Sequence, residues 1–411
     1  MSNPRLLVYT QDSFGLGHLR RATNLANALV AEHADLSVLL VVDSPVAPFF
    51  ELRPRVDFIK LPTVVKVGAG LFRTGRLGAD YEDVKALRSH LIRETVLRFA
   101  PHVILVDHMP GGANRELMPT LAAVRRRKLA TRMVLGLRDI IDEPAVTRAV
   151  WRRERTYAVM QRHYDEVLIY GSPEVFPAAE EYGIASVMGE HVKYCGYLCN
   201  LEEVEEPARV RAELGLLHLP IVAVTVGGGA DAYGLMQTYL EALRLLDARR
   251  RPATVMLTGP FLGESERLAL RERAGSLGVH VRSTGDGPST LNAADVVVSM
   301  AGYNTLSEIL RFGKRAIVVP RAGPSAEQRM RARLFATRGL IDLIEPTCLD
   351  AGTLARALER ALSATARPGP RSVPDLSGLA RASRALLEHL PCASTPAPAF
   401  DPAMQGLAVS S

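Results

Sequence analysis

The most informative residues lie in the second half of the chain, where an apolar run changes into a helical pattern. The run ends at Met300, and the expected first helical turn carries Gly302, Asn304 and Thr305. The first turn of a helix offers free backbone N–H groups and a positive dipole end, which together suit a diphosphate. Glu308 follows about one turn later, where its carboxylate would accept hydrogen bonds from the two hydroxyls of a ribose.

A pair of polar residues follows the next apolar run, 316–320. We expect Glu327 and Gln328 to contact further hydroxyl groups. A diphosphate, a ribose diol and a sugar are the parts of a nucleotide sugar. The alternative interpretation is an ordinary strand–helix unit, because its helix would need polar capping in any case.

Three consecutive glycines predict a second phosphate-binding turn. Gly227, Gly228 and Gly229 follow the apolar run 221–226 and precede a helical pattern. Glycines allow a ligand to approach the backbone closely, so that backbone N–H groups would make the contact. A plain strand-to-helix turn is the structural alternative.

The first apolar run leads into a glycine-containing loop. Gly15 and Gly17 permit a tight turn, and His18 begins the helical pattern that follows. A dinucleotide-binding fingerprint requires a third glycine where Arg20 stands, although Asp43 could imitate its ribose-binding acid. A nicotinamide cofactor is therefore the weaker interpretation.

His18 is the residue that we predict to be a general base. An imidazole titrates near neutrality and can accept the proton of an acceptor hydroxyl while a new bond forms. Asp107 ends another apolar run at the same sheet edge, so we expect its carboxylate to lie near the imidazole. The neighbouring His108 is a competing base. If neither acts in catalysis, His18 caps a helix and Asp107 caps a turn.

Hydrophobic periodicity predicts the elements that position these residues. Short apolar runs alternate with amphipathic helical patterns through most of the 411 residues, as in parallel sheets covered by helices on both faces. We therefore predict an α/β fold of two doubly wound, Rossmann-like domains that face each other across a cleft. The expected parts are an acceptor-side domain 1–199, a linker 200–207, a donor-binding domain 208–370, a helix within 371–390 and a disordered tail 391–411.

These motifs resemble the GT-B glycosyltransferases, both the plant secondary-product type and the lipid-sugar type that builds peptidoglycan precursor. The resemblance is specific at 15–21 and 301–328, and the segments 12–22 and 134–142 also resemble a bacterial group of predicted glycosyltransferases. It implies that Glu308 holds the ribose and that Asn304 and Thr305 face the diphosphate. Glu327 and Gln328 would contact the transferred sugar. The helix within 371–390 would return onto the N-terminal domain.

The chain departs from these families at three places. Met300 stands where the plant type has a phosphate-contacting histidine, and Gly229 replaces a hydroxyl residue of the peptidoglycan type. The segment 283–287 contains no aromatic residue to pack against a nucleobase. Uridine is the usual base in such enzymes, but dTDP and GDP sugars remain open.

Composition limits the classes of function. Hydrophobic residues make up 47% and the net charge is +6, which indicates a globular, mildly basic protein and gives no pattern for nucleic-acid binding. The four cysteines lack metal-site spacing, and no apolar run approaches the ~20 residues that span a bilayer. Without a signal-peptide pattern, we expect a cytoplasmic protein with at most peripheral membrane contact. We expect neither a metal nor a cofactor besides the nucleotide-sugar co-substrate.

The sequence thus predicts an inverting, metal-independent, hexosyltransferase-like glycosyltransferase. It would move a sugar from a nucleoside-diphosphate sugar to a hydroxyl of a small molecule or a lipid-linked sugar. The alternatives are a nucleotide-sugar 2-epimerase of the same fold and a non-catalytic sugar-nucleotide binding protein.

Overall fold

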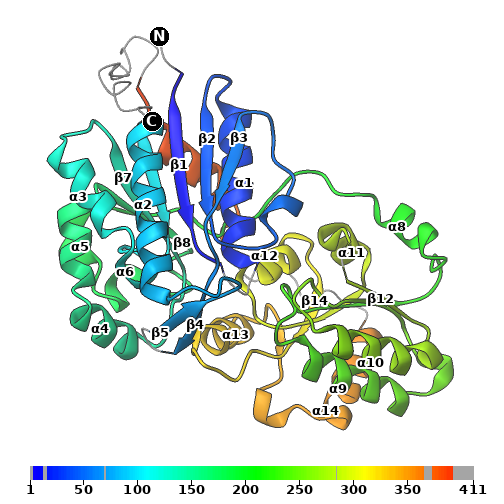
Figure 1. The fold of residues 1–411 in the computed structure, drawn as a ribbon. Helices are drawn as coiled ribbons and strands as arrows, with labels where there is room; N and C mark the ends of the chain where they lie inside the picture. Colours follow the sequence, from blue (N-terminus) through cyan, green and yellow to red (C-terminus); the bar gives the residue numbers. More distant parts are fainter. Residues whose placement is uncertain (1–2, 13–15, 69–70, 284, 365–372, 392–411) are drawn as a thin grey trace, which may run out of the picture.

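The computed structural model describes residues 3–12, 16–68, 71–283, 285–364 and 373–391. Two α/β domains lie side by side, the first in blue to green and the second in green to orange (Figure 1). Each has a parallel sheet between helical layers, which confirms the predicted fold class. The predicted tail lies outside the described residues, apart from residue 391.

The N-terminal sheet has seven parallel strands in the order β3-β2-β1-β6-β7-β8-β9. Its central strands are buried on both faces, which is why their sequences lack polar alternation. The strands are β1 (Arg5–Thr10), β2 (Ser37–Val42), β3 (Val56–Lys60), β6 (Val103–Asp107), β7 (Arg132–Arg138), β8 (Glu166–Tyr170) and β9 (Val192–Tyr194).

The helices of this domain and a small hairpin surround the sheet. The sequence did not reveal the antiparallel hairpin of β4 (Val64–Gly68) and β5 (Leu71–Thr74), nor the short strand β9. The helices are α1 (Gly17–Glu32), α2 (Tyr81–Phe99), α3 (Met118–Arg126), α4 (Pro144–Arg153), α5 (Thr156–His163), α6 (Ala178–Glu181) and α7 (Ala185–Met188), with short 3-10 turns η1 (Ala47–Phe49), η2 (Ala113–Arg115) and η3 (Gly189–His191).

The second domain repeats the plan with six parallel strands in the order β12-β11-β10-β13-β14-β15. The strands are β10 (Ile221–Thr225), β11 (Ala253–Leu257), β12 (Val279–Arg282), β13 (Val296–Ser299), β14 (Arg315–Val318) and β15 (Asp342–Leu343). The helices are α8 (Pro207–Glu213), α9 (Ala232–Leu245), α10 (Glu264–Ala274), α11 (Gly287–Ala293), α12 (Tyr303–Arg311), α13 (Glu327–Thr337) and α14 (Ala351–Ser363), with short turns η4 (Ala248–Arg250), η5 (Gly275–Leu277) and η6 (Pro346–Cys348).

The strand order explains why distant motifs meet. In the first sheet β1 lies between β2 and β6, so the chain reverses its direction of winding between β1 and β6. In the second sheet the same reversal falls between β10 and β13. Ligands of doubly wound folds bind outside the carboxyl ends of the strands at such a switch point. The four loops that follow β1, β6, β10 and β13 carry the motifs identified above, except Glu327 and Gln328, which follow β14.

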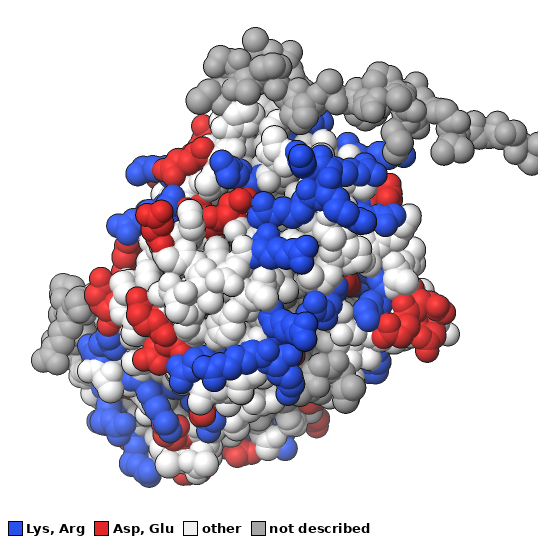
Figure 2. Space-filling view, turned by 90° about the vertical axis from the view of Figure 1, so that its left-hand side faces the viewer, with Lys and Arg blue, Asp and Glu red and all other residues white. Residues whose placement is uncertain are grey.

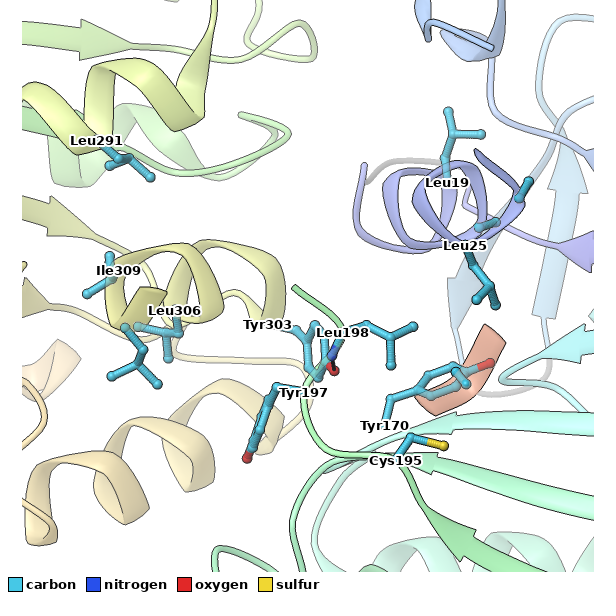
Figure 3. Packing of buried hydrophobic residues seen from close by; sticks show 14 of the residues in the cluster. Leu19, Leu25, Tyr170, Cys195, Tyr197, Leu198, Leu291, Tyr303, Leu306 and Ile309 are labelled. Atoms are coloured by element: carbon cyan, nitrogen blue, oxygen red, sulfur yellow. Dashed lines mark hydrogen bonds between the residues drawn. The ribbon is translucent and has the colours of Figure 1, made fainter. Parts of the chain in front are cut away.

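An apolar seam joins the two domains. One buried cluster includes residues of α1 and α12 and the segment after β9, and Figure 3 shows Tyr197 and Leu198 between the two helices. The rings of Tyr197 and Tyr303 stack with centroids 5.5 Å apart, and the Leu198 backbone N–H donates to the Tyr303 hydroxyl at 2.8 Å. The seam holds the carboxyl ends of both sheets face to face.

The last described helix, α15 (Gly378–Leu387), packs against the N-terminal domain. It lies beside α1 (Figure 1, red), and His389 contacts Glu166 of β8 at 2.8 Å. The chain therefore crosses between the domains twice, once before α8 and once before α15. None of the described helices is long and apolar enough to cross a membrane.

Candidate active site

A cleft of about 590 Å³ opens between the two switch points. Residues from both domains line it, because the loops after β1 and β6 face those after β10, β13 and β14. The predicted site residues that line it are Gly17, His18, Asp107, His108, Gly228, Gly302, Asn304, Thr305, Glu327 and Gln328. Gly229 and Glu308 do not line it, and Gly15 lies outside the described residues.

His18 and Asp107 form a close pair on the N-terminal side of the cleft. His18 Nδ1 lies 2.6 Å from Asp107 Oδ2, and the His18 backbone N–H donates to Asp12 Oδ2 at 2.9 Å. Asp12 thereby fixes the start of α1, and α1 in turn fixes the imidazole against β6. The structure thus brings together two residues that are 89 positions apart in sequence.

Arg21 is a member of this group that the sequence analysis missed. Its buried guanidinium donates two hydrogen bonds of 3.0 Å from Nη2 to Asp107, one to each carboxylate oxygen. Burial by itself raises the pKa of Asp107, but Arg21 and His18 outweigh it and hold that pKa well below its ordinary range. Asp107 is therefore ionised at neutral pH.

The charge on Asp107 decides the tautomer of His18. Arg21 Nη2 lies 2.8 Å from His18 Nδ1, so Nδ1 contacts both a donor and an acceptor. Because Asp107 is ionised, an unprotonated Nδ1 would face a carboxylate lone pair at 2.6 Å. The proton thus belongs on Nδ1, which leaves Nε2 as the basic nitrogen.

His108 lies beside His18, with ring centroids 5.1 Å apart. Burial, together with the nearby Arg138 and His18, lowers the pKa of His108 well below its ordinary value. Its buried Nδ1 has no hydrogen-bond partner within the described residues. His108 is a neutral imidazole without an orienting carboxylate of its own, which favours His18 as the base.

The amino end of α12 faces His18 from the other side of the cleft. Gly302 caps this helix in an extended conformation, and the cap has no side-chain hydrogen bond. The Asn304 side chain donates across the cleft to the Gly17 carbonyl at 3.2 Å. The first turn of α12 thus lines the cleft with Gly302, Asn304 and Thr305, and such a turn offers free backbone N–H groups to an anion.

Glu308 is engaged by the opposite domain. Arg20 Nη1, from α1, donates to Glu308 Oε1 at 3.0 Å. Burial raises the pKa of Glu308, and Arg20 and Arg311 only partly offset this effect. Arg20 lines the cleft, so Glu308 lies at its edge, directly behind a cationic side chain. Arg20 thus occupies one oxygen of the carboxylate that the sequence analysis assigned to the ribose.

The three glycines after β10 have different roles. Gly227 and Gly228 line the cleft, whereas a Cβ on Gly229 would lie 2.2 Å from the Thr258 carbonyl oxygen. Gly229 has φ +95°, which an L side chain rarely adopts. Gly229 thus lets the loop pack against β11 and its following turn, and Gly228 remains available to a ligand.

Glu327 forms ion pairs with one arginine from each domain. Arg138 Nη1 lies 2.9 Å from Glu327 Oε1, and Arg331 Nη2 donates to the same oxygen at 3.0 Å. Burial would raise the pKa of Glu327, but these two arginines outweigh it and lower the pKa. The carboxylate is therefore charged where it lines the cleft. The Gln328 Oε1 accepts from the Arg321 backbone N–H at 3.1 Å.

A fully buried ion pair lies beneath this part of the cleft. Arg331 donates to both oxygens of Asp139 in the N-terminal domain, at 2.9 and 2.6 Å. The Asp139 carboxylate also accepts from the Tyr197 hydroxyl at 3.1 Å. The pair fixes the two domains relative to each other, and Asp139 itself has no access to the cleft.

Comparisons with known proteins show which proteins this chain resembles. Residues 221–379 match the family model of the glycosyltransferase family 28 C-terminal domain. The chain is similar to two bacterial UDP-N-acetylglucosamine--N-acetylmuramyl-(pentapeptide) pyrophosphoryl-undecaprenol N-acetylglucosamine transferases. The protein from Exiguobacterium sp. is 26% identical over 84% of this chain and 88% of its own length. The protein from Paracidovorax citrulli is 32% identical over 34% of this chain, which spans only 39% of that relative.

Solved structures show the same two-domain fold. A UGT transferase from Siraitia grosvenorii in complex with UDP superposes with a TM-score of 0.56 at 15% identity, covering 93% of this chain and 94% of that one. A putative UDP-N-acetylglucosamine 2-epimerase from Listeria monocytogenes gives 0.59 at 14% identity, covering 97% and 99%. Because both folds fit, the fold alone does not separate transfer from epimerisation.

The fold is that of the GT-B glycosyltransferases, and the relatives that the chain resembles are glycosyltransferases. Within this class it is similar to the family 28 enzymes, whose C-terminal domain model matches its second domain.

Proposed function

We propose that this protein is an inverting glycosyltransferase that uses a UDP-sugar donor and His18 as the general base. The names of its relatives, which are UDP-N-acetylglucosamine transferases, support uridine as the nucleoside of the donor. The observation that carries the proposal is the position of the His18–Asp107 pair, directly across one cleft from the amino end of α12. A base and an anion-binding site on opposite walls are the parts needed for a single displacement.

The proposed reaction has one chemical step. His18 Nε2 accepts the proton of the acceptor hydroxyl while that oxygen forms a bond to the anomeric carbon of the sugar. The bond from the anomeric carbon to the diphosphate oxygen breaks, and the nucleoside diphosphate leaves toward Gly228 and the first turn of α12. Asp107 stabilises the imidazolium that forms. Inversion follows because the attack and the departure occur on opposite faces of the sugar.

The donor contacts are assigned by position. Asn304 and Thr305 lie at the end of α12 that faces the cleft, and Glu327 and Gln328 line the cleft where the transferred sugar would lie. Glu308 would accept hydrogen bonds from the ribose after Arg20 releases it. The acceptor is a hydroxyl of a lipid-linked sugar or of a small molecule, and the site of action is cytoplasmic, with peripheral membrane contact when the acceptor is a lipid.

We expect the substitution Glu308→Gln to weaken UDP binding. Hydrogen bonds to a charged group contribute about 1.5–3 kcal/mol, so the dissociation constant should rise roughly ten- to hundredfold. Isothermal titration calorimetry with UDP measures the change. The matched control is Glu359→Gln, which replaces an exposed carboxylate on α14 far from the cleft. Equal UDP affinity in the two variants would remove Glu308 from the donor site.

We expect transfer to continue in the presence of EDTA. In the proposed mechanism, the backbone N–H groups and the dipole of α12 stabilise the departing diphosphate without a metal ion. The rate of UDP release with acceptor present, measured with EDTA and with added Mg²⁺, tests this. Loss of activity in EDTA that Mg²⁺ restores would contradict metal independence.

The epimerase and the transferase hypotheses differ in whether the reaction needs an acceptor. An epimerase changes a UDP-sugar without any acceptor, whereas the proposed transferase releases UDP only at the slow rate of hydrolysis. Incubating the donor alone and following its anomeric and C2 protons by NMR distinguishes the two. Epimerisation without an acceptor would replace the transferase proposal. A sugar-nucleotide binding protein would bind UDP-sugar and change nothing.

A further inference from the structure

Tyr303 belongs at once to the donor side of the cleft and to the seam between the domains. It is the first residue of α12, directly after the Gly302 cap, and it lines the cleft. Its backbone therefore lies in the turn that offers free N–H groups to an anion. Its side chain is buried in the seam, where the hydroxyl accepts the Leu198 backbone N–H at 2.8 Å (Figure 3).

The ring of Tyr303 contacts two buried arginines. The guanidinium carbon of Arg21 lies 5.6 Å from the ring centroid, and that of Arg331 lies at the same distance. The Lys and Arg side chains on the face shown in Figure 2 lie at the surface, whereas Arg21 and Arg331 are buried. A guanidinium that has lost its water is attracted to the face of an aromatic ring more strongly than an exposed one. The Tyr303 ring therefore helps to hold both cations in place.

Arg21 connects this ring to the proposed base. Its Nη2 atom lies 3.0 Å from each oxygen of Asp107 and 2.8 Å from His18 Nδ1. A second ring, that of Tyr170 at the end of β8, lies 5.6 Å from the same guanidinium. Tyr170, Asp107 and His18 all belong to the N-terminal domain. Tyr303 thus brings the donor-binding domain into contact with the group that surrounds the base.

The charges around His18 act in opposite directions. Asp107 and Glu327 favour the charged imidazolium, whereas the Arg21 cation disfavours it. Arg21 touches both the imidazole and its carboxylate, so its position decides how far the charge of Asp107 is compensated. The titratable and charged groups that face His18 are Asp12 in the loop after β1, Arg21 on α1, Asp107 and His108 at the end of β6, and Glu327 on α13 with its partner Arg138 on β7.

We propose that Tyr303 is a positioning residue for the base, because its ring holds Arg21 against Asp107 and thereby sets the pH at which His18 can accept a proton. The inference rests on the proposed function, in which His18 is the base. Since Tyr303 also begins the helix that would hold the diphosphate, Arg21 has both of its rings only when α12 lies against α1. Separation of the domains would remove one ring, so the base is fully set only in the closed molecule.

The pH profile of kcat/KM for transfer tests the proposal. Tyr303→Leu removes the ring and keeps an apolar side chain. A loosened Arg21 compensates Asp107 less, which favours the imidazolium, so the acid limb of the profile should move to higher pH by up to about one unit. Tyr303→Phe keeps the ring and should leave the limb in place, although the Leu198 N–H loses its acceptor and the thermal midpoint falls. An unmoved limb in Tyr303→Leu, or an equal movement in Tyr303→Phe, would overturn the proposal.

A matched control separates this effect from a general loosening of the fold. Tyr239 on α9 is equally buried, contacts the Thr254 hydroxyl at 2.8 Å and does not line the cleft. Tyr239→Leu should lower the thermal midpoint and leave the acid limb in place. If this variant moved the limb as far as Tyr303→Leu does, the effect would be structural and the assignment wrong.

Arg21→Lys tests the same connection from the other side, and it does so even if Tyr303→Leu fails to fold. Lysine keeps the charge but lacks the planar fork that reaches both Asp107 oxygens and stacks on a ring. We expect the acid limb to move in the same direction as in Tyr303→Leu, and an unmoved limb would contradict the proposal. In the double variant the two shifts should not add, because both act through one guanidinium. Additive shifts would show that Tyr303 acts by another route.

Nuclear magnetic resonance of the protein with isotopically labelled histidine gives a readout without turnover. The His18 ring signal is identified by its absence in His18→Gln, and its pH midpoint should follow the acid limb in each variant. A midpoint that moves in Tyr303→Leu, in a protein that transfers no sugar, would refute the proposed function and keep the role of Tyr303. Transfer that depends on His18, with the same midpoint in the unaltered protein and in Tyr303→Leu, would refute this inference alone.

Discussion

His18→Ala lowers kcat for sugar transfer by roughly 10²–10⁴-fold, the range that a general base contributes, and leaves UDP affinity unchanged. The expectation follows from the geometry of the His18–Asp107 pair. His18 Nδ1 lies 2.6 Å from an ionised Asp107, which leaves Nε2 as the acceptor nitrogen of a residue that lines the cleft. UDP affinity is unaffected because the proposed donor contacts come from the opposite domain. Single-turnover transfer and calorimetric UDP titration measure the two quantities.

Three further variants make the assignment specific. Asp107→Asn should also reduce kcat strongly, because a neutral amide could neither hold the Nδ1 proton in place nor balance the charge of Arg21. His108→Ala should have a smaller effect, and His218→Ala, at an exposed histidine before β10, should have none. If His108→Ala caused the larger loss, the base would be His108. If every variant kept full activity, the cleft would not contain a histidine base.

Arg331→Ala destabilises the fold by roughly 3–5 kcal/mol, the cost of breaking a buried ion pair by removing one partner. Arg331 and Asp139 are 0% and 1% exposed, so the substitution leaves the Asp139 carboxylate buried without its guanidinium. Among the described residues, the Tyr197 hydroxyl would be the remaining hydrogen-bond donor to that carboxylate. Urea denaturation of the purified variant, followed by circular dichroism, measures the lowered midpoint.

The same helix provides the control. Arg333, two residues further along α13, pairs with Glu345 at 2.7 Å but is 63% exposed. Arg333→Ala should therefore cost no more than about 1 kcal/mol. Combining Arg331→Met with Asp139→Leu should be less damaging than Arg331→Ala, because no charge is then left buried. Equal midpoints for Arg331→Ala and Arg333→Ala would show that the interdomain pair does not stabilise the fold.

The sequence by itself determined the sheets and the location of the cleft. Unbroken apolar runs in this chain become strands buried on both faces, and the motifs at their carboxyl ends meet because parallel strands end at the same edge. This ground, together with the family resemblance, paired His18 with Asp107, and the two side chains do meet. The short strand β9 and the β4–β5 hairpin escaped notice because three to five residues give too little periodicity.

The tertiary structure alone decided which charges meet. Arg20 contacts Glu308 across 288 residues of chain, and Arg331 contacts Asp139 across 192, so no local pattern contains either pair. The pairing of Arg21 with Asp107 is also absent from any local pattern, because Arg21 lies on α1 and Asp107 ends β6. The backbone packing of Gly229 likewise depends on neighbours distant in sequence. Periodicity is a local property and fixes each element, whereas a pairing between side chains requires the two domains to be in place.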